Sequence, residues 1–251
     1  MIIASEKISP DIFSLKIKAP QAASVCRPGQ FMMVHLDRGD MILPRPISIC
    51  DCDREKGIIT LVYRIVGGGT KHLSELTAGY ELRLTGPFGN GFTIEDGLKK
   101  ALLVGGGIGT PPLILLLKEL NSRGVESEVY LGFRDTSVLA KDFEELGAKV
   151  YIATDSGGEG YRGNVVDLLG KLPPEADEIF SCGPKPMLRG LAQWALERRI
   201  PCQICLEERM ACGVGSCVGC VVERAGAAQP KYLKVCCEGP VFYAGRVVLD
   251  E

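Results

Sequence analysis

Cysteines crowd into one short stretch of this chain, and that crowding limits what the stretch can fold into. The chain has 251 residues and 11 cysteines, six of which fall between Cys205 and Cys237. The N-terminus lacks a basic start followed by an apolar run, so we expect neither a secretion signal nor an oxidising compartment. An odd number of cysteines also fits poorly with a disulfide framework. The stretch is therefore predicted to carry metal or redox chemistry.

The spacing of these cysteines indicates one kind of centre. Cys212, Cys217 and Cys220 follow the spacing C-x4-C-x2-C, and a fourth cysteine follows at Cys236 or Cys237. This arrangement holds a [2Fe–2S] cluster in plant-type ferredoxins. Glycines between the cysteines allow the backbone to wrap tightly, so that its N–H groups can point at the cluster sulfurs.

Two alternatives stay open at this point. The CxxC pairs at 202–205 and 217–220 have a plausible spacing for a structural zinc ribbon. That interpretation leaves Cys212 and the pair at 236–237 without a role. The cysteines would otherwise be buried free thiols that behave as small hydrophobic residues.

The first part of the chain has the pattern of an all-β domain. Short runs rich in β-branched and aromatic residues are separated by turn sequences such as RPGQ and GPFGNGF. Short strands at this spacing indicate a barrel or a sandwich, and we expect an antiparallel β-barrel over residues 1–98. The expected strands lie at 13–19, 31–36, 58–65 and 81–84, with a small helix over 71–76.

The pattern changes near Lys99. Expected strands such as ALLVGGG, EVYLGF and KVYIATD alternate with helical segments such as PPLILLLKELNSRG. This alternation predicts a parallel, Rossmann-like α/β domain over residues 99–201. Residues 202–251 are too few to be held by apolar burial alone, and a metal centre would supply the missing constraint. The predicted fold class is therefore α+β and multidomain, with a barrel, a nucleotide domain and a small C-terminal [2Fe–2S] domain.

A glycine-rich turn in the second domain predicts a dinucleotide site. VGGGIGTPPL follows an expected strand and opens an expected helix, whose N-terminus offers free N–H groups to a pyrophosphate. SCGPKPML lies at the end of a later strand, where parallel sheets form their ligand crevice. The candidate residues are Gly105, Gly106, Gly107, Gly109 and Thr110 in the turn, with Cys182 and Gly183 beside the nicotinamide.

Two segments of the first domain favour a phosphate-bearing ligand. RPISI places Arg45 in a rigid Arg-Pro context that suits a phosphate. In YRIVGGGT, Gly68, Gly69 and Thr70 precede the short expected helix, which again favours an anion. A surface salt bridge and a flexible turn would explain the same residues without a ligand.

Several function classes find no support in the sequence. The only histidines, His35 and His72, have no serine or carboxylate constellation nearby in sequence, so no catalytic side chain is assigned. The net charge of −2 argues against a nucleic-acid-binding surface. No apolar run approaches the roughly 20 residues of a membrane span, and we expect a soluble, cytoplasmic protein.

The motifs quoted above resemble a known family along the whole chain. RPIS, GGGIGTPP and CGPKPM are similar to segments of the ferredoxin–NADP reductase superfamily. The C-terminal LEERMACGVGSCVGCVV and KVCCEGPVF resemble, more particularly, the electron-transfer subunits of NAD-dependent (class 1B) dihydroorotate dehydrogenases.

This resemblance implies three cofactors: FAD, a [2Fe–2S] cluster and NAD as electron acceptor. The FAD residues that it implies are Arg45, Pro46, Ile47, Ser48, Val62, Tyr63, Arg64, Gly69 and Thr70. The implied cluster ligands are Cys212, Cys217, Cys220 and Cys236. Cys236 is preferred to Cys237 because Lys234-Val235-Cys236 keeps the family's register before Gly-Pro-Val-Phe. The family pattern gives Cys202 and Cys205 no role.

The resemblance also implies a partner. An FMN-containing catalytic subunit would oxidise dihydroorotate to orotate in pyrimidine biosynthesis, with two copies of each subunit in a heterotetramer. Electrons would run from that FMN to the cluster, to FAD and to NAD⁺, because a flavin exchanges both single electrons and hydride. Arg134 and Asp135 after the second α/β strand favour opposite choices between NADP and NAD, so NAD is preferred on resemblance alone.

Two other functions remain possible, one with the same FAD, nucleotide and [2Fe–2S] domains and one without redox cofactors. The chain would alternatively be the reductase subunit of a hydrogenase, a sulfite reductase or a ferredoxin–nicotinamide transhydrogenase. From another class, a zinc-stabilised binding protein would be colourless.

Overall fold

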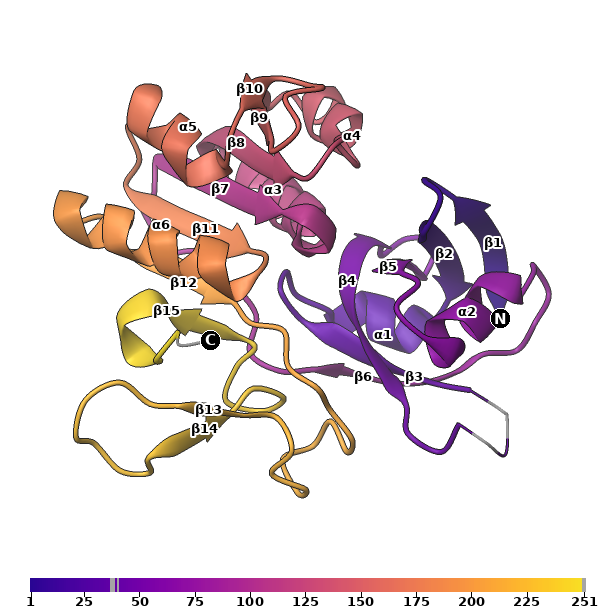
Figure 1. Ribbon diagram of the computed structural model, residues 1–251. Helices are drawn as coiled ribbons and strands as arrows, with labels where there is room; N and C mark the ends of the chain where they lie inside the picture. Colours follow the sequence, from indigo (N-terminus) through magenta and orange to yellow (C-terminus); the bar gives the residue numbers. More distant parts are fainter. Residues whose placement is uncertain (37–38, 40, 250–251) are drawn as a thin grey trace.

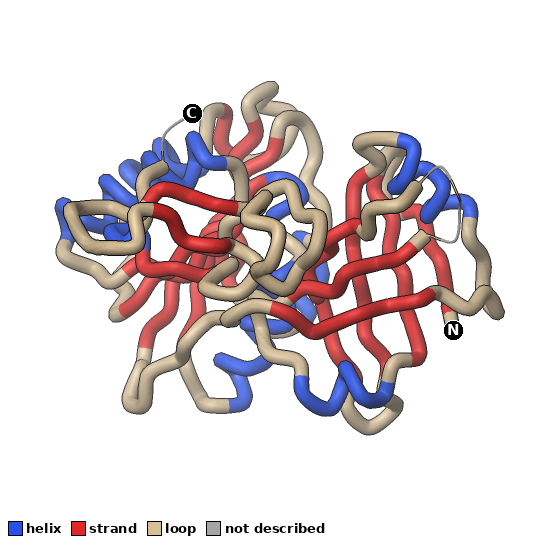
Figure 2. The backbone as a smooth tube through the Cα atoms, turned by 90° about the horizontal axis from the view of Figure 1, so that it is seen from below, coloured by secondary structure: helices blue, strands red, loops and turns tan. Residues whose placement is uncertain are grey.

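The computed structural model describes residues 1–36, 39 and 41–249, which form two large sheets and a C-terminal segment that contacts both (Figure 1). The sheets appear as two separate groups of strands in Figure 2. Among the described residues, no helix is both long enough and apolar enough to cross a bilayer.

The N-terminal sheet has six antiparallel strands in the order β1-β2-β5-β4-β3-β6. Alternate side chains such as Ile47 and Ile49 point into its core together with Leu15, Val34 and Leu61. Its elements are β1 (Ile2–Lys7), β2 (Ile12–Lys18), α1 (Pro20–Val25), β3 (Phe31–His35), β4 (Arg45–Asp53), β5 (Ile58–Arg64), α2 (Gly68–Glu75) and β6 (Arg83–Phe88). Antiparallel pairing is therefore confirmed. In the part of the chain that the structure describes, the edge strands β1 and β6 do not pair with each other, so closure of the sheet into a barrel stays a prediction.

The second sheet has the order β10-β9-β8-β7-β11-β12-β15. Every neighbouring pair is parallel except β12 and β15, so the predicted Rossmann-like sheet is confirmed. Its strands are β7 (Lys100–Gly106), β8 (Glu126–Phe133), β9 (Lys149–Thr154), β10 (Tyr161–Arg162), β11 (Glu178–Cys182), β12 (Cys202–Cys205) and β15 (Val241–Tyr243). The helices are η1 (Gly107–Gly109), α3 (Pro112–Ser122), α4 (Ala140–Glu145), α5 (Val165–Lys171) and α6 (Lys185–Arg198).

Helices cover both faces of this sheet. Leu102 and Val104 of β7 belong to one core with Leu188 of α6. Leu103, between them in sequence, points to the opposite core with Leu116 of α3. Both faces of a central parallel strand are buried, which explains why ALLV is apolar throughout.

Helix α3 lies between the two sheets. All of its first six residues, PLILLL, are buried, whereas a helix against one sheet would show polar residues on its other side. Leu115 completes the core of the N-terminal sheet, and Lys118 forms an ion pair of 2.7 Å with Asp51 of β4. The helix that opens at the glycine turn therefore also fixes the two sheets against each other.

We call residues 206–240, between β12 and β15, the cysteine segment. It contains the short antiparallel strands β13 (Val221–Glu223) and β14 (Tyr232–Lys234), and η2 (Ala244–Arg246) follows β15. The sequence predicted a domain boundary between residues 201 and 202, directly before β12. In the structure β12 pairs with β11 and so extends the α/β sheet.

Candidate functional site

A cavity of about 870 Å³ lies between the N-terminal sheet and the first residues of the cysteine segment. Most residues predicted to bind FAD line it, namely Arg45, Pro46, Ile47, Ser48, Val62, Tyr63, Arg64 and Thr70. They come from β4, β5 and the start of α2, so segments separated in sequence converge on one wall. Gly69, the remaining predicted FAD residue, is held against Arg45.

The Arg45 guanidinium is fixed at one end of this wall. Its Nη1 donates a hydrogen bond to the Leu43 carbonyl oxygen, and a side chain at Gly69 would collide with it. The Thr70 hydroxyl oxygen accepts hydrogen bonds from the backbone N–H groups of Val66 (2.9 Å) and Gly67 (3.3 Å). A fixed guanidinium beside a helix N-terminus is a suitable environment for a phosphate.

Tyr63 supplies a polar group that the protein itself does not satisfy. Its ring is buried, and its hydroxyl has no hydrogen-bond partner among the described residues. Burial also raises the pKa of the phenol, so it stays protonated and able to donate. Buried polar groups are normally paired, so this hydroxyl fits a cavity whose ligand provides the missing acceptor.

The glycine turn and the CGPKPM segment meet at the carboxyl ends of two adjacent strands. Gly105 at the end of β7 is the register partner of Cys182 at the end of β11. A methyl group on Gly109 would lie 2.6 Å from the Gly183 backbone, so the two loops touch backbone to backbone. Thr110 is fully buried, and its hydroxyl has no partner in the described chain.

These loops also lie at the point where the strand order reverses. β8 and β9 continue the sheet on one side of β7, and β11 and β12 continue it on the other. Ligands of such sheets bind in the crevice that opens at this switch point. Ile108 of the turn and Lys185 of CGPKPM also line the cavity described above. The two predicted sites are therefore continuous.

Four cysteines of the segment lie in two pairs, Cys212 beside Cys217 and Cys220 beside Cys236. The backbone N–H of Val214 donates to the Cys212 sulfur (3.4 Å), and this bond, with further N–H groups from Cys217 and Ser216, lowers the pKa of Cys212 to about 6. The Cys236 N–H donates to the Cys220 sulfur (3.4 Å), and Gly215 N–H donates to the Cys236 sulfur (3.2 Å). Each iron of a [2Fe–2S] cluster takes two protein thiolates, so two pairs of thiols suit that group.

The backbone around these thiols is constrained. Val218, between Cys217 and Cys220, has φ 51°, which is rare for a β-branched residue. Gly213 has φ +73°, and a methyl group there would lie 2.8 Å from Met33 Cγ of β3. Asn90 Nδ2, beyond β6, donates to the Cys237 carbonyl oxygen (3.1 Å). The cysteine segment is thus packed against the N-terminal sheet that carries the cavity.

The structure does not support the zinc-ribbon alternative. Cys202 and Cys205 lie three positions apart in β12, so their side chains point to opposite faces of the sheet and join different cores. Burial raises the pKa of Cys202 to about 12, as for a structural thiol. Within the residues described, no three His, Cys, Asp or Glu side chains converge on a site for a metal ion, and this holds for the four proposed cluster cysteines as well, so the separation of Cys202 from Cys205 is what argues against the zinc ribbon.

Comparison with known proteins agrees with this arrangement. Residues 1–92 match the model of the oxidoreductase FAD-binding domain, and residues 207–248 match that of the iron-sulfur cluster binding domain of dihydroorotate dehydrogenase B. A dihydroorotate dehydrogenase B (NAD(+)) electron transfer subunit from Geobacillus sp. (strain WCH70) is 40% identical, covering 99% of this chain and 97% of that protein. Its counterpart from Bacillus caldolyticus is 41% identical over 99% of this chain and 98% of that protein.

The chain belongs to the family of dihydroorotate dehydrogenase B electron transfer subunits. The resemblance drawn from its motifs is thereby confirmed, as are the expected FAD and iron–sulfur cofactors. A solved structure of an NADH-dependent reduced ferredoxin-NADP oxidoreductase superposes with a TM-score of 0.89 and 30% identity, covering 99% of this chain and 89% of that chain. The overall fold of this family member is thus that of ferredoxin–NADP reductases.

Sequence reasoning missed one wall of the cavity. Leu206, Glu207, Glu208, Arg209 and Met210 form it, directly before the first cysteine of the cluster motif. Glu208 Oε1 lies 2.7 Å from Lys185 Nζ, so this wall is tied to the CGPKPM loop. The sequence LEERM was visible as part of the family motif, but nothing in its pattern indicated that it faces the cavity.

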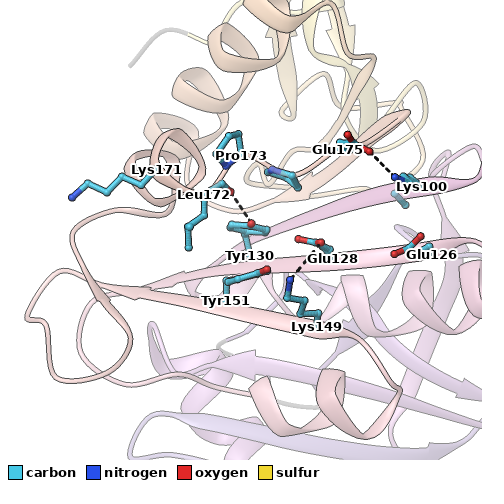
Figure 3. A pocket seen from close by; sticks show the side chains of 12 residues that line it. Lys100, Glu126, Glu128, Tyr130, Lys149, Tyr151, Lys171, Leu172, Pro173 and Glu175 are labelled. Carbon is cyan, nitrogen blue, oxygen red and sulfur yellow. Dashed lines mark hydrogen bonds and ion pairs between the residues drawn. The ribbon is translucent and has the colours of Figure 1, made fainter.

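A second cavity, of about 440 Å³, opens at the amino ends of β7, β8 and β9 (Figure 3). Its charged side chains neutralise one another, as in the Lys100–Glu175 ion pair of 2.7 Å, and the Tyr130 hydroxyl donates to the Leu172 carbonyl (2.8 Å). No predicted site residue lines it. It lies on the edge of the sheet opposite the crevice, and we assign it no role in this family member.

Proposed function

We propose that this protein transfers electrons between an FMN-containing dihydroorotate dehydrogenase catalytic subunit and NAD⁺, using bound FAD and a [2Fe–2S] cluster. One observation carries the proposal: the wall at residues 206–210 joins β12, at the crevice, to the cysteine loop, and it lines the cavity between them. A flavin exchanges hydride with nicotinamide and single electrons with an iron–sulfur cluster, and so supplies the chemistry that this arrangement requires.

The FAD site is the cavity against β4 and β5. Arg45, Gly69 and Thr70 would hold the pyrophosphate, since they form the cationic end of the cavity. Ser48 and Tyr63 would lie along the flavin ring, where the unpaired Tyr63 hydroxyl can donate. Pro46, Ile47, Val62 and Arg64 complete this wall.

NAD would bind in the crevice between β7 and β11. Gly105, Gly106, Gly107, Gly109 and Thr110 would admit its pyrophosphate, and Cys182 and Gly183 would border the nicotinamide. A higher kcat/KM with NADPH than with NADH would contradict the preference for NAD.

The cluster ligands would be Cys212, Cys217, Cys220 and Cys236. Cys236 is supported as the fourth ligand because it is buried and lies against Cys220, whereas Cys237 is exposed. We propose three functional domains with the division after 98 and 201 expected from the sequence, and β12 as the strand that connects the last two.

The catalytic subunit would dock near Cys217. This cysteine is exposed, and the apolar side chains of Val214 and Val218 beside it are exposed as well. Electron transfer requires the partner's FMN to come close to the cluster. We propose a heterotetramer with two copies of each subunit, in which the partner oxidises dihydroorotate to orotate for pyrimidine biosynthesis.

The first experiment is an absorption spectrum with iron and zinc analysis on anaerobically purified protein. We expect flavin bands, additional iron–sulfur absorbance and about two irons per chain. A colourless protein that contains one zinc would overturn the redox function.

A matched pair of variants tests the fourth ligand. Cys236→Ser should lose the iron–sulfur absorbance and nearly all iron, whereas the adjacent Cys237→Ser should keep both. The reverse result would assign the ligand to Cys237.

A second candidate function has support from the structural comparison. The similarity to the NADH-dependent reduced ferredoxin-NADP oxidoreductase favours a ferredoxin–nicotinamide transhydrogenase subunit with the same modules. Reconstitution separates the two. We expect NADH formation from dihydroorotate once a class 1B catalytic subunit is added, and none from this chain alone. NADH formation only from reduced ferredoxin would favour the second function.

A further inference from the structure

Two cysteines that the proposed function does not use lie together in the core of the N-terminal sheet. Cys26 directly follows α1, and Cys52 lies near the end of β4. The Sγ atoms of Cys26 and Cys52 lie 3.7 Å and 3.1 Å from one acceptor, the carbonyl oxygen of Ala23. Both side chains pack in the same core, and the two thiols hydrogen-bond to each other. The fold therefore brings two free thiols into contact from distant parts of the chain.

These two thiols differ in their access to solvent. Cys26 is 1% exposed, whereas Cys52 is partly exposed. Burial raises the pKa of Cys26 to about 12, the hydrogen bond to Cys52 acts in the same direction, and the positive charge of Arg54 opposes both. Arg54 Nη2 also donates a hydrogen bond of 3.1 Å to the Cys26 carbonyl oxygen. A reagent in solution therefore meets Cys52 first, with Cys26 directly behind it.

Another pair of neighbouring thiols lacks this access. Cys182 and Cys205 are register partners on β11 and β12, but their side chains are only 0% and 1% exposed. Deeply buried thiols are inert because no reagent reaches them while the sheet is folded. Partial exposure of one sulfur thus distinguishes Cys26 and Cys52 from a pair that is only close.

We propose that Cys26 and Cys52 form a reversible disulfide when the protein meets a low-molecular-weight disulfide, RSSR. The Cys52 thiolate attacks one sulfur of RSSR, and the first RSH leaves. The Cys26 thiolate then attacks the Cys52 sulfur of this mixed disulfide, and the second RSH leaves. The two protein thiols lose two electrons and two protons, which reduce RSSR to two RSH. In a compartment that keeps thiols reduced, such a bond is transient and responds to oxidation.

The disulfide would close a loop over residues 27–51, which holds β3 and most of β4. This loop includes Arg45 and Ser48 of the cavity wall, so its effect on FAD rests on the proposed function. A disulfide stabilises mainly by restricting the unfolded chain, and the same restriction opposes local opening of the wall. The oxidised protein should therefore unfold at a higher temperature and release FAD more slowly.

Peptide mapping of the full-length holoprotein tests the disulfide. The protein is incubated anaerobically with oxidised glutathione, its remaining thiols are alkylated, and its tryptic peptides are analysed by mass spectrometry. We expect a cross-link between Cys26 and Cys52 that dithiothreitol reverses, and none between Cys182 and Cys205. The Tm should rise by about 5 °C, and the release of FAD should slow about 5-fold.

Three variants assign the roles of the two sulfurs. Cys26→Ser should stop the reaction halfway and leave glutathione attached to Cys52. Cys52→Ser should carry no glutathione at Cys26, because that thiol is buried. Cys50→Ala is the matched control, since Cys50 packs in the other core but shares a tryptic peptide with Cys52. It should still form the cross-link, and the Tm of each reduced variant shows that it is folded.

The outcomes separate the disulfide from the function of the protein. Glutathione on Cys52 without a cross-link in the unaltered protein would overturn the proposal, because the two sulfurs would not meet. An equally fast cross-link between Cys182 and Cys205 would overturn it too, since that result indicates general opening. A cross-link with unchanged FAD release would overturn the effect on the cavity wall. Failure of the reduced protein to bind FAD would instead contradict the proposed function, and the cross-link could still be measured.

Discussion

The α/β sheet and the cysteine segment are stabilised in different ways. The sheet has seven strands and a buried core on each face, with helices covering both. The cysteine segment has only two strands of three residues each, and of its four proposed cluster ligands Cys220 and Cys236 are buried, Cys212 is half-buried and Cys217 is exposed. Apolar burial suffices for the first region, whereas in the second we expect bonds to the metal centre to order the exposed loop around Cys217.

The two regions nevertheless share a core. Cys220, Val222, Leu233 and Val235 of the cysteine segment belong to the same group of buried side chains as Leu188 of α6. One end of the segment is therefore supported by the sheet, while the loop around Cys217 is exposed. The comparison teaches that removal of the cluster should loosen the loop without unfolding the sheet.

The largest expected effect comes from removing a ligand. Cys217→Ser should abolish the cluster, because three thiolates do not complete the coordination of two irons. FAD and NADH-dependent diaphorase activity should remain, since neither the cavity nor the crevice includes Cys217. Iron analysis, flavin content and limited proteolysis would measure this, with cleavage expected between residues 210 and 220. Loss of FAD in the variant would show that the two regions are not separable.

Truncation of a core side chain in the α/β sheet should have the opposite effect to the ligand substitution, lowering stability and leaving the iron content unchanged. Leu103→Ala in β7 should lower the free energy of unfolding of the sheet by about 3 kcal/mol, because a fully buried leucine leaves a cavity. Urea unfolding can be followed through Trp194, the only tryptophan, which lies on α6. Iron content should not change. Leu233→Ala in β14 is the matched variant, and the free energy of unfolding that it removes should become larger after iron is chelated. If Leu233→Ala lowers the free energy of unfolding equally with and without iron, the two regions are not stabilised differently.

The smallest effect concerns a buried carboxyl group of the sheet. Glu178 in β11 is 4% exposed, and its Oε1 accepts a hydrogen bond of 2.7 Å from Gln203 Nε2. Burial raises the pKa of Glu178 in the folded protein. The folded state therefore binds the proton more tightly, so this group's contribution to stability is largest below its unfolded pKa and is lost as the pH rises through the folded value.

Glu178→Gln keeps an acceptor for Gln203 and removes the buried charge. We expect it to raise the Tm at neutral pH by about 2 °C, and to have no effect below a pH of about 4. Glu175→Gln, at an exposed residue paired with Lys100, is the control. A Tm difference that does not depend on pH would argue against titration of Glu178.

The strongly periodic elements could be predicted from the sequence. The alternation after residue 99 predicted β7, β8, β9 and β11 with their helices, because each buried strand or helix has its own apolar pattern. The glycine turn was predictable for the same reason, since it links a strand to a helix. In the N-terminal part β1, β4 and helix α1 were missed, because IIASEK and RPISICDCD mix polar and apolar residues. Only the first two residues of β6 were expected to be extended, since GPF has the composition of a turn.

Tertiary relations could not be predicted in this way. Nothing local in CQIC indicates that β12 joins the parallel sheet, or that its two cysteines serve opposite cores. The cavity wall at residues 206–210 has no periodic pattern because it is an irregular strap between two ordered regions. The role of the wall depends on what lies across from it, and a single sequence does not encode that explicitly.

The antiparallel pairing of β12 with β15 has a consequence for cofactor assembly. Cys205 and Val241 are register partners, so both ends of the cysteine segment are tethered at one point of a stable sheet. Since the loop ends already meet, the entropy of closing that loop is spent during folding and not during cluster insertion. We therefore expect the folded protein to lose its cluster and receive another without returning to the unfolded state.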